Sequence, residues 1–339
     1  MGPVPPDRRR EGFGDALYAR GDLPANARAE QAEIRYTSVV AVYRGRFAPS
    51  PTGPAHLGTA RSALIGWLRA RAAGGAFVLR MEDLDRPRVR PGAAEEMLSD
   101  LRWLGLDWDE GPDVGGPFGP YTQSERLGRY HEVLMELEAL GQTYPCTCSR
   151  KEIAEIASAP HGDEGPIYPG LCRDGPRHPK REPATRFRMP EAPTFVDGFA
   201  GEIRVDVAGD FVIHRKDGVF AYQIACVVDD HDMHITEVLR GDDLLSSTPR
   251  QIALYRALGW EVPDFFHVPL VLGDDGQRLA KRHGAIAIAE LREAGWSAEA
   301  LVGKLAHGAG LTPSDAPVSA ADLVERFDPS SLRREPASW

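Results

Sequence analysis

The stretch RFAPSPTGPAHLGTA, residues 46–60, is rich in proline and glycine and joins two apolar segments of different character. The preceding segment SVVAVY (38–43) is β-branched and predicts a strand. The following segment ARSALIGWLRARAAGG (60–75) repeats apolar residues at helical spacing and predicts a helix. A strand that turns directly into a helix N-terminus presents free backbone N–H groups and the positive end of the helix dipole. The stretch therefore predicts a phosphate-binding turn.

Several residues of this turn suit contact with a phosphate. Gly53 and Gly58 let the backbone approach a ligand closely, whereas His56 and Thr59 offer an imidazole and a hydroxyl to phosphate oxygens. For the His-x-Gly pair alone, an ordinary strand–helix turn with an incidental histidine is an equal alternative. The whole stretch is more specific than that pair.

The bulk composition restricts the class of protein. With 339 residues the chain is long enough for about two domains, and its 42% of hydrophobic residues can form sizeable cores. We expect no membrane-spanning helix, because no apolar run approaches the ~18 residues that a bilayer requires. The formal net charge of −10 disfavours indiscriminate binding to nucleic acid but permits local basic contacts with a folded RNA. The grouped cysteines favour a reducing compartment and a metal site over disulfides.

Strand and helix signals alternate at both ends of the chain and are interrupted by a different middle. The segment AFVLRMEDLD (76–85) predicts a buried strand that ends in carboxylates. The segment TPRQIALYRALG (248–259) predicts a helix with Thr248 as its N-cap. Between about 160 and 190 the sequence is rich in Gly, Pro and Arg, which is typical of an insertion. The pattern predicts a doubly wound α/β domain that carries an inserted subdomain.

Several stretches together resemble the class I aminoacyl-tRNA synthetases, in the form of the glutamyl and glutaminyl members. They are RFAPSPTGPAHLGTAR, FVLRMEDLDRPR, LGLDWDEGP, YTQSERLGRYHEVL, DFVIHRKDGVFAYQIACVVDDHDMHITEVLRGDDLL and STPRQIALYRALG, and they cover most of residues 44 to about 310. The resemblance implies a Rossmann-type catalytic domain with an inserted zinc-bearing α+β subdomain. We expect a disordered tail, a first catalytic half, the insertion, a second catalytic half and a C-terminal helical region, at 1–38, 39–145, 146–210, 211–283 and 284–339.

Both signature motifs of that family occur in altered form. Its His-Ile-Gly-His motif corresponds to HLGT (56–59), in which Thr59 replaces the second histidine. Its Lys-Met-Ser-Lys-Ser loop corresponds to RLAKR (278–282), in which Lys281 is kept and alanine replaces the first serine. By resemblance, His56, Thr59 and Lys281 are the catalytic residues. ATP, with Mg²⁺ bridging its phosphates, is expected to contact His56, Gly58, Thr59, Arg278, Leu279 and Lys281.

The implied reaction joins an amino-acid carboxylate to the α-phosphate of ATP and expels pyrophosphate. The nucleophile is already charged, so such a site acts by positioning and by stabilising charge on the phosphates. The expected substrate is L-glutamate, whose extra carboxylate suits an arginine clamp. Arg46 and Arg240 are both candidates, and the sequence leaves open which arginine holds which carboxylate. Tyr222 offers a hydroxyl, Glu82 can pair with the α-ammonium group, and the further expected contacts are Phe47, Ala48, Pro49 and Ser50.

The cysteines of the middle segment predict a metal site. Cys146, Cys148 and Cys172 provide three thiolates, and a structural zinc site needs a fourth ligand. Histidine, at 161 or 178, is the usual chemical choice. The resemblance implies Tyr168 instead, because the glutamyl-queuosine tRNA(Asp) synthetase family carries Cys-x-Cys followed by Tyr-x₃-Cys. We expect one structural Zn²⁺ per chain, the alternative being reduced cysteines without a metal.

The end of the sequence helps to choose between branches of the family. The segment after about 311 is too short for the helical anticodon-binding domains of an ordinary glutamyl-tRNA synthetase. With the cysteine pattern, this favours formation of glutamyl-adenylate and transfer of glutamate to queuosine in the anticodon of tRNA(Asp). The alternatives are a truncated glutamyl-tRNA synthetase that charges the 3′ end of tRNA(Glu), a small nucleotidyltransferase and an inactive zinc-dependent RNA-binding module. We expect a cytoplasmic monomer without membrane association.

A basic run beside the predicted metal site is a candidate contact for RNA phosphates. A solvated flank is an equally good interpretation of such a run. Its members are Arg173, Arg177, Lys180, Arg181, Arg186 and Arg188.

Overall fold

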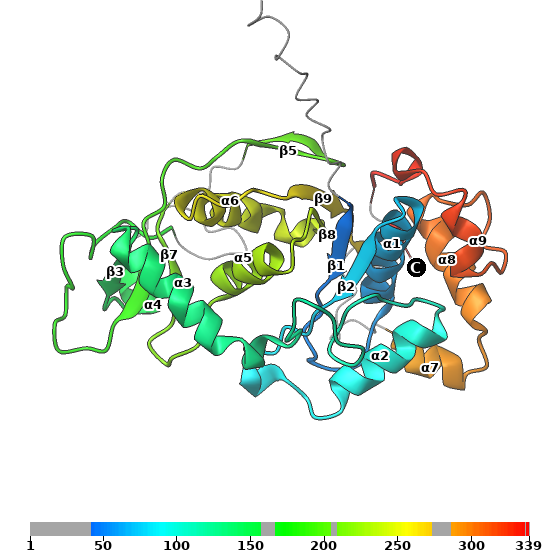
Figure 1. Cartoon of the computed structure of the whole chain (residues 1–339), viewed down its shortest axis with the longest axis horizontal. Coiled ribbons are helices and arrows are strands. Elements are labelled where there is room, and N and C mark those ends of the chain that lie inside the picture. The colour runs from blue at the N-terminus through cyan, green and yellow to red at the C-terminus, as the bar shows by residue number, and fades with distance from the viewer. Residues whose placement is uncertain (1–41, 157–166, 205–208, 273–285, 336, 339) are drawn as a thin grey trace, which may run out of the picture. The chain divides into compact units, whose positions relative to one another are not determined.

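The computed structural model describes residues 42–156, 167–204, 209–272, 286–335 and 337–338. Its main sheet is parallel and has the strand order β2-β1-β8-β9 (Figure 1). The strands are β1 (Arg44–Phe47), β2 (Ala76–Leu79), β8 (Glu237–Gly241) and β9 (Asp264–Val268). Because β1 pairs with β2 on one side and with β8 on the other, the order of the strands reverses at β1. The predicted doubly wound α/β architecture is confirmed.

The first strand in the described part of the chain follows the segment in which the sequence predicts one. It occupies Arg44–Phe47, whereas Val42 and Tyr43 belong to no strand and residues 38–41 lie outside the described part. Val42 is 67% exposed. Pairing of Arg44–Phe47 with Ala76–Leu79 decides where the strand lies, and it outweighs the β propensity of the preceding residues.

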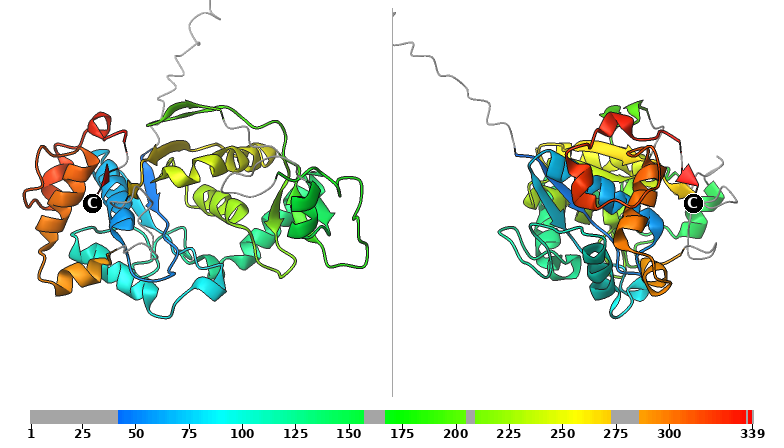
Figure 2. Two further views of the ribbon diagram at one scale, coloured as in Figure 1. Left: turned by 180° about the vertical axis from the view of Figure 1, so that it is seen from behind. Right: turned by 90° about the vertical axis from the view of Figure 1, so that its right-hand side faces the viewer.

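Helices cover both faces of this sheet. Alternate residues of β2 point to opposite faces, so Phe77 packs in one core with Leu64 of α1, and Val78 packs in another with Ile252 of α6. Figures 1 and 2 show α8 and α9 beside α1, while α3, α5 and α6 share a core of their own. The helices are α1 (Leu57–Ala72), α2 (Ala93–Trp103), α3 (Leu127–Ala139), α4 (Arg150–Ile156), α5 (Tyr222–Asp232), α6 (Thr248–Ala257), α7 (Ile288–Glu293), α8 (Ala298–Ala309) and α9 (Ala320–Val324).

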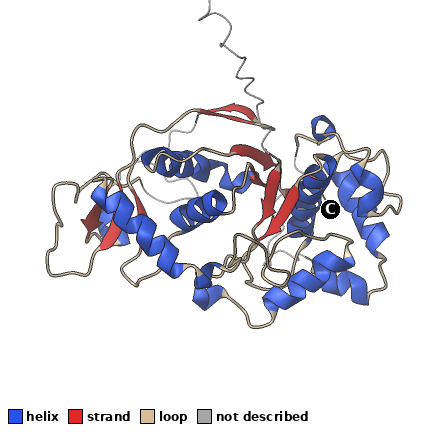
Figure 3. Cartoon of the chain, in the orientation of Figure 1, coloured by secondary structure: helices blue, strands red, loops and turns tan. Residues whose placement is uncertain are grey.

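The middle of the chain forms a separate antiparallel sheet with the order β3-β4-β7. Figure 3 shows strands of this region apart from those of the main sheet. Next to it in sequence, the hairpin β5–β6 contacts β9 of the main sheet through a hydrogen bond of 2.8 Å from the amide of Gly198 to the carbonyl of Phe265. The remaining elements are β3 (Thr143–Cys146), β4 (Ala184–Phe187), β5 (Phe195–Asp197), β6 (Gly201–Ile203), β7 (Phe211–His214), β10 (Val271–Leu272), β11 (Ala337–Ser338) and the short 3₁₀ turns η2 (Arg86–Arg88), η3 (Gln123–Glu125), η4 (Asp242–Ser247) and η6 (Pro329–Ser331).

Two further findings concern the helices. The N-cap of α6 is Ser247 and not Thr248, which is the first helical residue and uses its hydroxyl elsewhere. Within the described residues, none of the helices combines the length and the apolar character that crossing a bilayer would need.

Candidate active site

The residues expected to bind substrates gather where the parallel strands end. In open α/β sheets, ligands bind outside the carboxyl ends of the strands at the point where strand order reverses. Here that point is β1, whose last residue Phe47 begins the loop of Ala48, Pro49 and Ser50. Backbone hydrogen bonds fix this loop to the segment after β2: the amide of Glu82 donates to the carbonyl of Pro49 at 3.0 Å. The loop after β1 and the segment after β2 that carries Glu82 are therefore joined at one edge of the site, the rim.

The N-terminus of α1 has the features of a phosphate site. His56 is its N-cap residue and makes no capping hydrogen bond with its side chain, and the first turn contains no acidic residue. The amide of Ala60 donates to the carbonyl of His56 at 2.8 Å, so the amides of Gly58 and Thr59 precede the first helical hydrogen bond. A Cβ atom added to Gly58 would meet nothing within 4 Å. Gly58 thus faces open space into which a ligand can approach the backbone. The predicted Arg278, Leu279 and Lys281 lie outside the described residues.

A buried arginine that sequence patterns do not single out, Arg80, organises the carboxylates of the candidate site. Its Nη1 donates to Oδ1 of Asp230 at 2.7 Å and its Nη2 to Oε1 of Glu82 at 3.1 Å. Its Nε lies 3.5 Å from Oδ2 of Asp229. Burial raises the pKa of Glu82 even though Arg80 opposes the rise. The only signal in the sequence is a charged residue directly after the apolar strand AFVL.

Arg46 belongs to the same charged network. Its Nε donates to Oδ1 of Asp230 at 3.2 Å, and its Nη1 donates to the carbonyl of Leu239 at 3.1 Å. Burial favours a higher pKa for Asp230, but the charges of Arg80 and Arg46 outweigh burial and hold that pKa below its usual value. Arg46 is therefore a cation whose charge is already balanced by a carboxylate of the protein.

Arg240 differs from Arg46 because all its hydrogen-bond partners among the described residues are neutral. Its Nε donates to Nε2 of His267 at 3.0 Å. Its Nη1 donates to the hydroxyl of Tyr222 at 3.1 Å and its Nη2 to the hydroxyl of Thr248 at 2.7 Å. The residue is only 6% exposed, and none of the ion pairs within the described residues includes it. A buried guanidinium without a carboxylate is poised to take up an anion.

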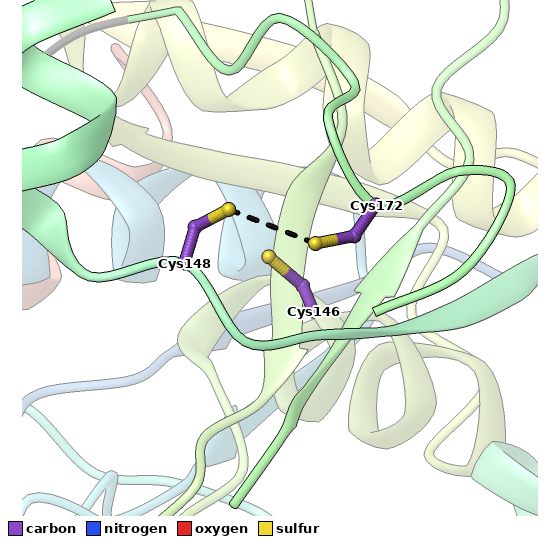
Figure 4. A group of neighbouring side chains, drawn as sticks. All are labelled: Cys146, Cys148 and Cys172. Carbon is purple, nitrogen blue, oxygen red and sulfur yellow. Dashed lines mark hydrogen bonds between the residues drawn. The ribbon is translucent and has the colours of Figure 1, made fainter. Parts of the chain in front are cut away.

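The structure brings together the predicted metal ligands of the insertion. The sulfur atoms of Cys146, Cys148 and Cys172 all lie within 4.8 Å of one another, and those of Cys148 and Cys172 are 3.6 Å apart (Figure 4). Sulfur atoms bound to one tetrahedral Zn²⁺ at ~2.3 Å lie roughly 3.8 Å apart. The hydroxyl of Tyr168 lies 3.3 Å from the sulfur of Cys146 and 3.6 Å from that of Cys148. Three thiols, with one phenol beside them, thus lie close enough together to hold a metal ion.

The surroundings of this cluster bear on the fourth ligand. Tyr168 is buried, and the guanidinium of Arg186 lies over its ring, 3.8 Å from the centroid. His178 turns its Nε2 toward Glu152 instead, at 2.8 Å from Oε1. Residue 161 lies outside the described part. Burial opposes the thiolate form of Cys172, but backbone and hydroxyl donors lower its pKa to about 6.

Comparison with known proteins agrees with these sites. The family described as tRNA synthetases class I (E and Q), catalytic domain, matches residues 42–331. The chain is 56% identical over 304 residues to the glutamyl-Q tRNA(Asp) synthetase of Symbiobacterium thermophilum, covering 86% of this chain and 94% of that protein. It is 47% identical to the glutamate–tRNA ligase of Desulforamulus reducens, covering 78% of this chain but 57% of the ligase. The crystal structure of glutamate-tRNA synthetase from Elizabethkingia anophelis superposes with a TM-score of 0.77 at 32% identity, covering 88% of this chain and 68% of that one.

The two kinds of relative differ in their identity to this chain and in how much of each protein is matched. The glutamate–tRNA ligase extends well beyond the matched region, whereas the glutamyl-Q tRNA(Asp) synthetase is matched over nearly its whole length. The chain therefore belongs to the class I tRNA synthetases of the E and Q type and, within them, to the glutamyl-Q tRNA(Asp) synthetases.

Proposed function

We propose that this chain activates L-glutamate with ATP and transfers the glutamyl group to queuosine in the anticodon of tRNA(Asp). In the first step an oxygen of the α-carboxylate attacks the α-phosphorus of ATP, and the bond to pyrophosphate breaks. In the second step a hydroxyl of queuosine attacks the adenylate carbonyl, and AMP leaves. The names of the relatives that match over most of their length support this reaction.

The observation that carries the proposal is the charge balance of Arg240. This guanidinium is buried at the carboxyl edge of the sheet beside Tyr222, and its partners in the described part of the chain are all neutral. The α-carboxylate of the substrate has to reach the ATP phosphate at the N-terminus of α1, so we assign Arg240 to the side-chain carboxylate. Glu82, at the rim beside Pro49, is then placed to receive the α-ammonium group. An acidic amino acid satisfies both ends of such a pocket.

The phosphates of ATP would lie at the start of α1. His56 and the amides of Gly58 and Thr59 would donate to them, and Lys281 would add a positive charge from the loop 278–282. Mg²⁺, bound together with ATP, would neutralise charge on the phosphates. These residues orient two reactants and need move no proton, because the attacking carboxylate is already ionised.

We further propose that the insertion holds one Zn²⁺ through Cys146, Cys148, Cys172 and Tyr168. The spacing of their ligand atoms supports this set. The ion would be structural, since four protein ligands leave no open position for a substrate. It would fix the segment 167–177 against β3. We also propose that the enzyme works as a monomer in the cytoplasm, where ATP and tRNA are present.

The decisive experiment uses labelled glutamate, ATP and purified tRNAs. We expect label on tRNA(Asp) that contains queuosine, and none on tRNA(Asp) that lacks it. After ribonuclease digestion the label should be on the anticodon fragment, and removal of the 3′-terminal adenosine should not prevent labelling. Label on tRNA(Glu) that requires the 3′ adenosine would favour the truncated glutamyl-tRNA synthetase. Absence of any glutamate-dependent ATP–pyrophosphate exchange would reject activation altogether.

A further inference from the structure

A buried chain of hydrogen bonds links the β5–β6 hairpin to Arg240. Asp197, the last residue of β5, places its Oδ2 2.6 Å from Nδ1 of His267 on β9. On the other edge of this imidazole, Nε2 lies 3.0 Å from Nε of Arg240. The exposed fractions of Asp197, His267 and Arg240 are 2%, 1% and 6%. The hairpin is thus linked to Arg240, the candidate substrate-binding arginine, through one imidazole ring.

The donors and acceptors of this chain fix the proton on His267. A guanidinium only donates, so Nε2 of His267 accepts from Arg240 and carries no proton. The proton of the neutral ring is then on Nδ1, which donates to Asp197. Burial lowers the pKa of His267, and the charge of Arg240 adds to this effect against the opposing influence of Asp197. The ring is therefore neutral at neutral pH.

Asp197 is held in place by backbone amides. Its Oδ1 accepts from Phe199 at 3.0 Å, from Ala200 at 2.8 Å and from the amide of His267 at 3.2 Å. Burial opposes ionisation, but His267 and these amides hold the pKa of Asp197 below its usual value. The carboxylate is thus ionised and points in one direction, which a flexible surface carboxylate would not do.

We propose that Asp197 and His267 are positioning residues that orient the Arg240 guanidinium for a substrate carboxylate. The proposal rests on the proposed glutamate activation. A neutral imidazole holds Nε of Arg240 without balancing its charge, whereas a carboxylate in the same place would compete with the substrate.

The remaining hydrogen bonds of Arg240 agree with this role. His267, Tyr222 and Thr248 use three of the five N–H groups of the guanidinium, which leaves two for a ligand. Two N–H groups are what a bidentate carboxylate takes. The hairpin therefore contributes to amino-acid binding without touching the amino acid.

Asp197→Asn tests the proton assignment with almost no change in volume. The three backbone amides around Oδ1 need an acceptor, so the asparagine oxygen stays with them and its NH₂ group faces Nδ1 of His267. The ring must then accept at Nδ1 and carry its proton on Nε2, where it opposes the N–H of Arg240. We expect the glutamate KM in ATP–pyrophosphate exchange to rise about tenfold, with kcat and the KM for ATP changed less than about threefold.

A pair of substitutions at His267 separates positioning from packing. His267→Gln keeps an acceptor oxygen near Arg240 and should hold the glutamate KM within about threefold of the unsubstituted enzyme. His267→Leu fills the space without an acceptor and should raise that KM about tenfold or more. Asp217 is a carboxylate that pairs with Arg215 in an exposed turn. Asp217→Asn is therefore the matched control for loss of one negative charge, and it should leave all kinetic constants unchanged.

The proton itself is read by ¹⁵N NMR of the histidine rings, with His267 identified by the signal that His267→Gln removes. We expect the Nδ1–H form in the unsubstituted protein and the Nε2–H form in Asp197→Asn. A switched ring with an unchanged glutamate KM would overturn the proposal, and so would equal KM values for Gln and Leu at position 267. If the unsubstituted enzyme shows no glutamate-dependent exchange, with or without tRNA, the proposed function fails, while the ring signal still reports whether Asp197 controls His267.

Discussion

At the scale of single residues, the two pocket arginines differ in what neutralises them. Arg46 shares Asp230 with Arg80, while Arg240 has an imidazole and two hydroxyls around it. Both arginines are suggested by the sequence, but their different charge balance depends on residues 150 or more positions apart, such as Arg80 and Asp230. A linear pattern does not contain that information.

Arg240→Gln should therefore affect binding and not folding. We expect the glutamate KM to rise at least about 100-fold, because the substrate loses hydrogen bonds to a charged group worth roughly 3 kcal/mol. The melting temperature should stay the same or increase, since a buried cation without a carboxylate partner is removed. Exchange kinetics and thermal unfolding measure the two effects.

Arg46→Gln is the matched substitution at an arginine that does pair with a carboxylate of the protein. Removing this cation leaves Asp230 with less compensation, so the free energy of unfolding should fall by roughly 3 kcal/mol. If Arg240→Gln were the more destabilising of the two, Arg240 would be a structural residue and its assignment to the substrate would be wrong.

Asp100 on α2 provides a pH-dependent prediction away from the pocket. It is fully buried, and neither carboxylate oxygen has a hydrogen-bond partner in the described part of the chain. Burial raises the pKa of Asp100 to about 6. The charge of Arg292 opposes this rise, and the charge of Glu96 adds to it. Folding favours the protonated form, so this residue destabilises the protein increasingly as pH rises from about 4 to about 6, and fully above that.

Asp100→Asn should thus stabilise the protein at pH 7.5 by about 2 kcal/mol. Most of this gain should disappear at pH 4, where the native carboxyl is protonated too. Urea unfolding at the two pH values measures the difference. A gain of equal size at both would mean that charge is not its cause.

At the scale of elements, tertiary contacts explain where local signals fail. Of the strand predicted at 38–43, the described residues Val42 and Tyr43 lie in no strand, and pairing with β2 places a strand at Arg44–Phe47. Thr248 has the sequence of an N-cap, but its hydroxyl accepts from Arg240 and the cap moves to Ser247. In contrast, Ser149 and Glu152, which have the spacing of a capping box, form the reciprocal hydrogen bonds of that motif at the start of α4. Local rules hold where no distant residue competes.

Two variants of the segment that carries the cysteines distinguish between a tyrosine and a histidine as the fourth ligand of the proposed zinc ion. Tyr168→Phe should lower zinc affinity roughly 10- to 100-fold, as removal of a ligand or its support usually does. His178→Gln should leave the affinity unchanged, since this ring faces Glu152. Zinc content after dialysis and competition with a chromophoric chelator measure both variants. Loss of zinc from His178→Gln alone would identify the histidine as the ligand.

At the scale of the whole molecule, the fold class could be predicted from the sequence, but the contacts between the sheets could not. The doubly wound sheet follows from alternating signals. The contact of the β5–β6 hairpin with β9 does not, because it brings Asp197 to His267 across 70 positions. For the same reason, no sequence pattern singles out Asp197, His267 or Arg80. All three contact residues of the candidate site, directly or through one other side chain.

Folding pairs or buries several cations of the basic run in the insertion. Arg173 pairs with Asp210, Arg181 pairs with Glu152, and Arg186 is buried over Tyr168. Arg177 and Lys180 are exposed and pair with no carboxylate in the part of the chain that the structure describes. Arg188 donates to the carbonyl of Arg173, so Arg177 and Lys180 are the two exposed cations of the run that remain for a partner. In a chain with a net charge of −10, two such cations act locally.

Replacing both, Arg177→Gln with Lys180→Gln, tests whether this face meets RNA. If each cation contacts one phosphate, the double variant should weaken tRNA binding equally with and without queuosine, and the slope of log affinity against log salt should fall by roughly 1.5 to 2. Glutamate-dependent pyrophosphate exchange should stay unchanged, because the pocket lies on a different sheet. Arg326→Gln, an exposed cation of the C-terminal region, controls for net charge. An unchanged salt slope would mean that these side chains are simply solvated and that the tRNA binds elsewhere.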